Sequence, residues 1–242
     1  HCNNRNPRFD GIRNAPEENC DYRNNVIYDW GSNTIYAGEG GHYNIVNNYF
    51  KYGPSTHASV RYRIINPGRR EPDIPFGKWY VNGNYVYGNP SMSADNRKGV
   101  VMGNGGNASD KKETLVADPW PVMALPTETA EEAFHSVLAG AGASFRRDTL
   151  DQRIVQDVLQ GTGHFIDVQG GFPHGTAYEE TLKAWPYLAS LPAPTDTDQD
   201  GMPDDWEKAH GLNPSDPADA AGHQLDASYT NIEVYINSLV HL

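Results

Sequence analysis

The sequence predicts an all-β fold, a right-handed parallel β-helix accompanied by packing helices and a small loop-and-helix tail. Glycine (24 residues), proline (17) and tyrosine (14) are abundant among the 242 residues, a composition that suits short strands, frequent turns and stacked aromatic rings. An amide-rich pattern recurs before short apolar runs in the first part of the chain. A helical pattern begins only after Thr127. These observations together favour stacked β-coils with helices that pack over them.

The recurring pattern places Asn residues directly before an apolar or aromatic run. Its copies are Asn24-Asn25-Val26-Ile27-Tyr28, Asn47-Asn48-Tyr49-Phe50-Lys51-Tyr52 and Asn82-Gly83-Asn84-Tyr85-Val86-Tyr87, which start 23 and then 35 residues apart. Such a period is typical of a solenoid, and Asn side chains stacked at a coil corner can bond one another and the turn backbone. The loop-forming run 67–72 accommodates the longer interval. An antiparallel β-sandwich with Asn-rich turns is the alternative.

Three segments follow from these textures. Residues 1–125 are predicted to be the C-terminal coils of the β-helix, because a stack needs neighbouring coils or a cap over its ends. We therefore expect missing N-terminal coils of the same protein as a partner. Residues 126–192 are a predicted helical and irregular wrap, with helices over 128–141 and 148–161. Residues 193–242 form an EF-hand-like tail that follows a proline-bearing linker and ends in a helix from about Thr230 to Leu239.

The tail contains a dozen residues, Asp196 to Glu207, that match the calcium-loop template. Carboxylates stand at template positions 1, 3, 5, 9 and 12, Gly201 stands at position 6, and position 7 contributes a backbone carbonyl. Five carboxylates in one tight loop repel one another unless a cation lies between them, so Ca2+ is the expected cofactor; a solvated acidic turn is the alternative. The predicted metal ligands are Asp196, Asp198, Asp200, Met202, Asp204 and Glu207.

A second, weaker loop pattern lies further along the tail. The run 229–233 is like the exit of another calcium loop, but Leu225 and Ala227 occupy ligand positions. Either this is a degenerate partner loop, with Asp226 or Glu233 as an auxiliary ligand, or it is a plain packing helix.

Whole-chain properties exclude several classes of partner. The net charge of −12 argues against nucleic acid and against anionic membrane surfaces. No apolar run approaches the roughly 18 residues of a membrane span. Cys2 and Cys20 are the only cysteines, and they either pair or remain free thiols. The calcium loop favours a secreted, cell-surface or periplasmic protein.

Two arginines near the start of the chain form the strongest candidate for chemistry, in the run Arg5-Asn6-Pro7-Arg8. Pro7 favours extended backbone at Asn6, so we expect both arginines on a stiff, strand-like segment. Two guanidiniums close together would attract an anionic ligand. The alternative is that they pair with nearby acids such as Glu17 or Glu18.

This run resembles the Arg-x-Pro motif of polysaccharide lyase family 1, the pectate lyases. The amide-aromatic coils, the runs 141–151 and 161–163 and the proline-linked calcium tail also look like secreted pectate lyases of gut and marine bacteria, so the resemblance spans nearly the whole chain. It implies β-elimination of polygalacturonate, the backbone of pectin, on a right-handed parallel β-helix. Arg5 matches the base that takes the C5 proton, which Ca2+ on the uronate carboxylate makes more acidic.

The sequence departs from the family at two places. The family's second arginine, five residues after the first, is replaced by Asp10, and we expect Arg8 to supply the substrate-binding cation instead. The family's catalytic calcium is held by acids upstream of the motif, so that site is not assigned to Asp10, Glu17, Glu18 or Asp21. The chain alone is therefore expected to be weakly active or inactive. Deprotonating a guanidinium near pH 9 costs about 5–6 kcal/mol, which predicts activity that rises into the alkaline range.

Two other functions remain open from the sequence. A polygalacturonase-type hydrolase would need two carboxylates flanking the bond, and the β-repeat shows no such pair. A non-catalytic pectin-binding or surface module would use exposed aromatic rings as sugar platforms, unless those rings stack along the solenoid. The candidate rings are Tyr49, Tyr52, Tyr85 and Tyr87.

Overall fold

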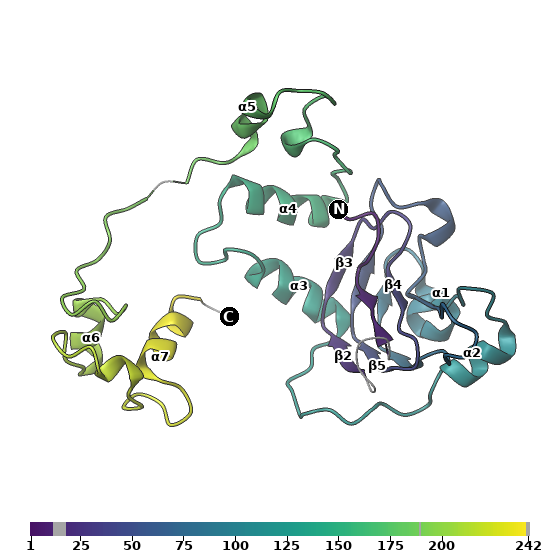
Figure 1. Cartoon of the computed structure of the whole chain (residues 1–242), viewed down its shortest axis with the longest axis horizontal. Coiled ribbons are helices and arrows are strands. Elements are labelled where there is room, and N and C mark those ends of the chain that lie inside the picture. The colour runs from purple at the N-terminus through teal and green to yellow at the C-terminus, as the bar shows by residue number, and fades with distance from the viewer. Residues whose placement is uncertain (12–17, 189, 241–242) are drawn as a thin grey trace. The chain divides into compact units, whose positions relative to one another are not determined.

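The computed structural model describes residues 1–11, 18–188 and 190–240, which form two compact units. The larger unit comprises His1–Ala139 and Gln152–Ala184, and the smaller comprises Gly140–Asp151 and Trp185–Leu242 (Figure 1). Part of the segment predicted as a wrap therefore groups with the strands. The predicted boundaries after residues 125 and 192 stay predictions.

The strands of the larger unit form three parallel sheets. The chain passes through one strand of each sheet and then returns to the first sheet, so each round of three strands stacks on the round before it. Every strand pair in the described residues is parallel, which rules out the antiparallel sandwich and is compatible with a parallel β-helix. The sheets are β1 (Arg8–Phe9), β4 (Ile35–Ala37) and β7 (Ile65–Pro67); β2 (Asn19–Arg23), β5 (His42–Val46) and β8 (Lys78–Asn82); and β3 (Val26–Tyr28), β6 (Tyr49–Lys51) and β9 (Tyr85–Val86).

Side chains that point inward stack from one coil to the next. Tyr43 and Trp79 are paired in register on β5 and β8, both are fully buried, and their rings lie 4.0 Å apart. Phe9 also stacks on Tyr43, with ring centroids 4.8 Å apart, and its ring lies 5.8 Å from that of Trp79. Aromatic stacks of this kind bury a large apolar area and also fix the spacing of the coils.

The predicted amide stack is confirmed, and it runs through the corner between the second and third sheets. The side-chain N–H of Asn25 donates to Asn48, that of Asn48 donates to Asn84, and that of Asn84 donates to Asn96, at 2.9, 2.9 and 3.0 Å. The last rung, Asn96, lies at the start of a 3₁₀ helix and was not predicted. Each oxygen also accepts the backbone N–H of the rung before it, so the amides take the place of a strand ladder at the corner.

The structural repeat is 36 residues here, one more than the 35 counted between the starts of the pattern copies, because β6 pairs with β9 in the register Tyr49 to Tyr85. The reason is the backbone at the residue before each rung. Asn24 and Asn47 have φ of 55° and 53°, and Gly83, with φ 69°, takes the equivalent place. The repeat is therefore a left-handed residue followed by a stacked Asn, and either Asn or Gly satisfies its first position.

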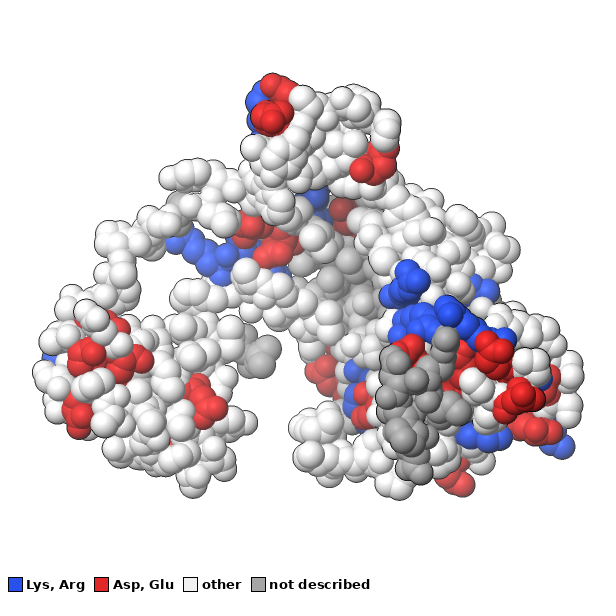
Figure 2. All heavy atoms as spheres, in the orientation of Figure 1, with Lys and Arg blue, Asp and Glu red and all other residues white. Residues whose placement is uncertain are grey.

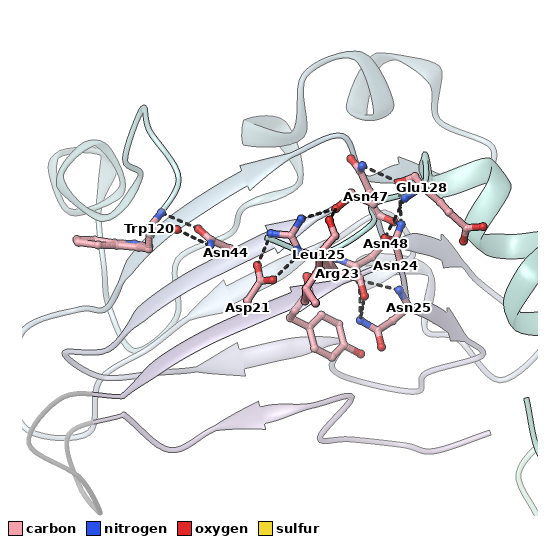
Figure 3. Close-up of polar contacts among 12 residues, drawn as sticks. Asp21, Arg23, Asn24, Asn25, Asn44, Asn47, Asn48, Trp120, Leu125 and Glu128 are labelled. Atoms are coloured by element: carbon pink, nitrogen blue, oxygen red, sulfur yellow. Dashed lines mark hydrogen bonds and ion pairs between the residues drawn. The ribbon is translucent and has the colours of Figure 1, made fainter. Parts of the chain in front are cut away.

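The outward-facing amides hold the segment that follows the coils (Figure 3). The side chains of Asn24 and Asn47 both donate to the backbone carbonyl of Glu128, at 2.8 and 2.7 Å. Asn44 exchanges two hydrogen bonds with the backbone of Trp120, and Arg23 donates to the Thr127 hydroxyl. The two amides of each predicted Asn-Asn pair therefore have different roles, one inside the ladder and one binding the wrap.

Helices surround the coils. The helices α3 and α4 confirm the two predicted ones to within two residues at each end, and Phe134 and Val158 pack from them against Tyr49 of β6. Lys51, only 6% exposed, donates to the carbonyls of Val158 and Leu159 at the end of α4. Among the described residues before the tail, the helices are α1 (Pro90–Ala94), α2 (Ala108–Thr114), α3 (Ala130–Gly140), α4 (Thr149–Gln160) and α5 (Tyr178–Thr181), with 3₁₀ helices η2 (Ala58–Val60), η3 (Asn96–Gly99), η4 (Gln169–Gly171) and η5 (Leu182–Ala184).

The smaller unit contains α6 (Asp204–His210), the 3₁₀ helix η6 (Asp219–Ala221) and α7 (Asn231–Ser238). The predicted final helix is confirmed. The Trp206 ring of α6 packs edge-on against Tyr235 of α7 at 5.0 Å, and Met202 is fully buried. Within the described part of the chain, no helix is long and apolar enough to cross a membrane.

Candidate functional site

Arg5 lies on a turn that leads into β1. Its backbone has φ 66°, its N–H donates to the Asn4 side chain at 2.8 Å, and the peptide between Asn6 and Pro7 is cis. The Asn6 side chain donates to the carbonyls of Cys2 and Asn33, which fixes the turn against the next coil. The expectation of strand-like backbone at Arg5 is therefore wrong, because β1 begins only at Arg8.

The Arg5 side chain is exposed and lines a groove of about 1600 Å³. One wall of the groove is the lead-in to β1 together with β2 and β3, where Tyr22 and Tyr28 are found. The opposite wall is α4 and the chain after it, which contribute Arg153 and His164. Among the described residues, no carboxylate forms an ion pair with Arg5. A free guanidinium facing a groove can meet an anionic ligand or take part in proton transfer.

The wall contributed by α4 is fixed to the coils by polar contacts. The Tyr28 hydroxyl donates to the carbonyl of Thr162 at 2.6 Å, and the Phe165 N–H donates to the Ser55 hydroxyl at 3.0 Å. His1 pairs through Nδ1 with buried Asp29 and lies 3.6 Å through Nε2 from Asp157. Asp157 is the only carboxylate among the described residues that line the groove. The groove therefore has a cationic character despite the acidity of the chain.

Arg8 has a different environment from Arg5. Its guanidinium forms an ion pair with Asp10 at 2.6 Å, and this hydrogen bond raises the pKa of Arg8 above its usual value. Arg8 is not among the described residues that line the groove. The structure thus does not bring the two arginines together, and the substrate-binding role of Arg8 stays a prediction. Glu18, named as a possible partner, instead accepts from the Tyr43 hydroxyl at 2.5 Å, while Glu17 lies outside the described residues.

The tyrosines considered as sugar platforms are largely occupied by packing. Tyr49 is only 9% exposed and lies between Tyr85 and Phe134, with ring centroids 4.7 and 4.3 Å away. Tyr52 contacts the rings of Tyr62 and Tyr87 and the guanidinium of Arg61. These rings stack along the coils, which is the alternative that the sequence left open to a role as sugar platforms.

The second candidate site is the acidic loop of the tail. The side chains of Asp196, Asp198 and Asp200 converge, with carboxylate oxygens within 4.8 Å of one another. Glu207 extends from α6 toward Asp200 and is completely buried. Residues 193–242 contain ten acidic side chains and one basic side chain, Lys208, and Figure 2 shows the resulting acidic surface of this unit.

Several oxygens of this cluster are buried without a hydrogen-bond partner in the described residues. They are Oδ2 of Asp198, Oδ2 of Asp200 and both carboxylate oxygens of Glu207. Burial and the neighbouring carboxylates, Asp200 first, raise the pKa of Glu207 to about 7. Buried carboxylate oxygens are normally paired, and oxygens this close fit the 2.3–2.6 Å ligand distances of Ca2+. The donor set therefore fits a calcium ion.

Other acids predicted for the metal have structural roles. Both oxygens of Asp204 accept hydrogen bonds from Thr197, one from its N–H and one from its hydroxyl, each at 2.8 Å, and these bonds lower the pKa of Asp204. Asp226 accepts the N–H groups of Ser228 and Tyr229, and Glu233 forms a capping box with Thr230. The second loop is thus a turn followed by a capped helix in this structure. Asp204 belongs to neither of the two clusters of converging carboxylates among the described residues.

Sequence reasoning missed one member of the cluster, Asp219. Its carboxylate lies within 4.8 Å of those of Asp200 and Glu207, and its Oδ1 is buried without a partner in the described residues. It lies twelve positions beyond the template, so the loop pattern gave no signal for it. Outside the tail, the described residues contain no comparable group of three metal-binding side chains. Cys2 and Cys20 are both free thiols, which resolves the open choice.

Comparison with known proteins finds relatives that share one name. The chain is 32% identical over 98% of its length to "Probable pectate lyase C" of Aspergillus terreus, and 31% and 30% identical, also over 98%, to proteins of that name from Emericella nidulans and Aspergillus fumigatus. It spans about half the length of these relatives. No family model matches. The relatives are fungal and do not support the bacterial attribution.

Proposed function

We propose that this chain, which is similar over nearly its whole length to probable pectate lyases, belongs to that family and is the base-bearing part of a secreted lyase that cleaves polygalacturonate by β-elimination. The fold we propose is a right-handed parallel β-helix, of which the three observed rounds of strands are a part. Polygalacturonate is a long polyanion that cannot cross a membrane, so the enzyme must meet its substrate outside the cell. Among the described residues, β1, β2 and β3 each have one unpaired edge, where further coils can add in parallel.

The observation that carries the proposal is the position of Arg5. Its guanidinium is exposed, is free of carboxylate partners in the described residues and faces the groove, and its backbone is fixed by Asn4 and Asn6. In the proposed reaction, the neutral guanidine takes the C5 proton of a uronate, the C4–O4 bond breaks, and a C4–C5 double bond forms. The departing O4 takes up a proton and becomes the end of the released chain. Calcium bound to the uronate carboxylate would acidify the C5 proton.

The groove supports elimination over hydrolysis. Hydrolysis by two carboxylates requires an acid on each side of the glycosidic bond. Asp157 is the only acid on the described lining, and it contacts Thr162 and His1. A cationic groove instead suits a polyanionic substrate. We also propose that Arg8 contacts the substrate. Its guanidinium would have to break the ion pair with Asp10 and form one with a uronate carboxylate.

We also propose that the tail binds one Ca2+ through the predicted loop. Buried Glu207, with neither oxygen hydrogen-bonded among the described residues, supports this. The ion would have a structural role, because the carboxylates that would hold it converge within the tail itself.

Product analysis tests the proposed reaction. Polygalacturonate and Ca2+ are incubated with the protein that contains these residues, and ultraviolet absorption and reducing ends are both recorded. Elimination produces one ultraviolet-absorbing unsaturated end for each new reducing end. Reducing ends without ultraviolet absorption would establish hydrolysis instead and overturn the proposal.

A further inference from the structure

We propose that Asp219, which lies outside the predicted loop, is a ligand of the tail's calcium ion and takes the place that the template gives to Asp204. This inference rests on the proposed calcium site and adds a residue from a separate segment. The ion would then join the loop 196–207 to the chain around η6. The consequence is that calcium organises the tail as a whole and not one loop alone.

The first step of the argument concerns Asp204. At template position 9 this residue contributes a ligand, often through a water molecule. Here its two oxygens are already occupied by the N–H and the hydroxyl of Thr197, and the Lys208 ammonium lies 3.7 Å away. It is also absent from both groups of converging carboxylates. Asp204 therefore does not join the converging carboxylates of the described residues, and its template position is open to another oxygen.

The second step concerns the position of Asp219. Its carboxylate is within 4.8 Å of those of Asp200 and Glu207, and oxygens on one Ca2+ lie up to about 5 Å apart. Asp219 is 9% exposed, and its Oδ1 has no hydrogen-bond partner among the described residues, whereas its Oδ2 accepts the Asn213 N–H at 2.8 Å. One oxygen is thus positioned by the backbone and the other is left for a cation, an arrangement that orients metal-binding carboxylates.

The third step follows the contacts from Asp219 to α7. The backbone carbonyl of Asp219 accepts the side-chain N–H of Asn231 at 2.8 Å, and Asn231 is fully buried at the start of α7. The Asn231 side chain also donates to Gln224 at 2.6 Å, and its backbone N–H donates to the Gly222 carbonyl at 2.8 Å. A ligand bond at Asp219 would therefore stabilise the position of α7 as well as that of the loop.

Calorimetric titration with Ca2+ alone tests this inference on the full chain and on three variants. Asp219→Asn keeps the shape and the acceptor for Asn213 but loses the charge, and its calcium affinity should fall at least about tenfold. Asp216→Asn makes the same charge change in an exposed residue of the same segment and should leave the affinity near the wild-type value. Asp204→Asn should also have only a small effect.

Thermal unfolding separates a ligand from a merely structural acid. If Asp219 is a ligand, Asp219→Asn lowers the melting temperature of the tail with Ca2+ but maintains or raises it in a chelator, because one carboxylate of a repelling group is removed. A structural role would lower the melting temperature in both conditions. Wild-type affinity in Asp219→Asn, or an equal loss in Asp204→Asn, would overturn this inference. Absence of calcium binding by the wild-type chain would instead overturn the proposed calcium site itself.

Discussion

Asn48 and Asn84 are buried side chains on successive coils, and the amide N–H of Asn48 donates to the amide oxygen of Asn84 at 2.9 Å. The same oxygen accepts the backbone N–H of Asn48, also at 2.9 Å. Asn48 in turn accepts from both the backbone and the side chain of Asn25. Each rung thus satisfies groups on the coil before it and on the coil after it, so removal of one rung affects three coils.

We expect Asn48→Ala to lower the free energy of unfolding of the larger unit by about 2–4 kcal/mol. The substitution leaves two partly buried N–H donors of Asn25 without their acceptor, and it removes the side-chain hydrogen bonds that Asn48 donates to the buried Asn84 oxygen and to the Tyr22 carbonyl. Each such loss is costly. Unfolding in urea, followed by tryptophan fluorescence, measures the change. Asn82→Ala is the matched control, because Asn82 is exposed and, within the described part of the chain, its side chain bonds the Tyr80 hydroxyl alone. Equal stability of the two variants would contradict the ladder's energetic role.

The ladder also indicates how much of the fold could be predicted. The strands after Asn24 and Asn47 and the stacked amides follow from a local pattern, and so do the capped helices. Asn96 could not be predicted, because its rung lies on a 3₁₀ helix with no strand pattern after it. The binding of the wrap to Asn24 and Asn47 is likewise invisible to local patterns, since the acceptor is a backbone carbonyl at residue 128, more than eighty positions away.

The contact of α4 with the coils depends strongly on Lys51. Its ammonium donates to two carbonyls at the C-terminus of the helix, at 2.5 and 2.9 Å, where the helix dipole also favours a cation. Lys51→Met keeps the apolar stem but removes the donors, so we expect the unfolding free energy to fall by about 1–3 kcal/mol.

Hydrogen exchange is the second measurement for Lys51→Met. Amides of α4 and of 161–165 should exchange faster in the variant than in the wild type, whereas the exchange of the β5 amides should not change. Lys98→Met is the control, because Lys98 is more than half exposed and pairs only at the surface. Unchanged protection of α4 in Lys51→Met would show that apolar packing through Val158 is sufficient to hold the helix.

Stability should fall at high pH because of one buried and one partly buried tyrosine, Tyr43 and Tyr22. Burial raises the pKa of Tyr22 to about 12 and also raises that of Tyr43, whose hydroxyl bonds Glu18. Unfolded tyrosines ionise near pH 10, so above that pH the unfolded chain has lost protons that the folded chain retains, and stability falls as pH rises.

The expected slope is up to about 1.4 kcal/mol per pH unit for each such tyrosine between pH 10 and 12. Melting temperatures measured across this range for the wild type and Tyr22→Phe should show a shallower decline in the variant. Tyr187→Phe is the control, since Tyr187 is 91% exposed and its surroundings change little on unfolding. An identical decline in all three proteins would contradict burial as the cause.

The candidate base was predictable because Arg-x-Pro is a local motif, but its surroundings were not. Sequence reasoning placed Arg5 and Arg8 on one strand, whereas the turn at Arg5 separates them and Asp10 takes the second guanidinium. The far wall of the groove comes from α4, some 150 residues later, which the sequence had indicated only as packing. Asp219 escaped notice for the same reason, because the fold brings it to Asp200 and no template position does.

The lyase proposal predicts a defined effect of Arg5 variants. Arg5→Lys and Arg5→Ala should each lower the rate of unsaturated-product formation at least about a hundredfold, because loss of a positioned base costs that much or more. The wild-type rate should rise toward alkaline pH, since a neutral guanidine becomes more abundant there. Arg97→Ala removes an exposed arginine that is not on the groove lining and should retain the wild-type rate. A neutral optimum, or full activity in Arg5→Ala, would exclude Arg5 as the base.

Removal of calcium should unfold the tail while the coils remain folded. The carboxylates of Asp196, Asp198 and Asp200 converge on one point, and without a cation their repulsion and the burial of Glu207 oppose the folded tail. At a Ca2+ concentration one hundred times the dissociation constant, binding stabilises the tail by about 2.7 kcal/mol. A chelator should therefore lower the tail's melting temperature, followed by the fluorescence of Trp206, and leave the amide exchange of β5 unchanged.

Asp200→Ala should have the same effect, whereas Asp205→Ala, which removes a fully exposed carboxylate next to the site, should not. If the chelator and Asp200→Ala both leave the tail's melting temperature unchanged, the acidic loop is a solvated turn and binds no structural ion.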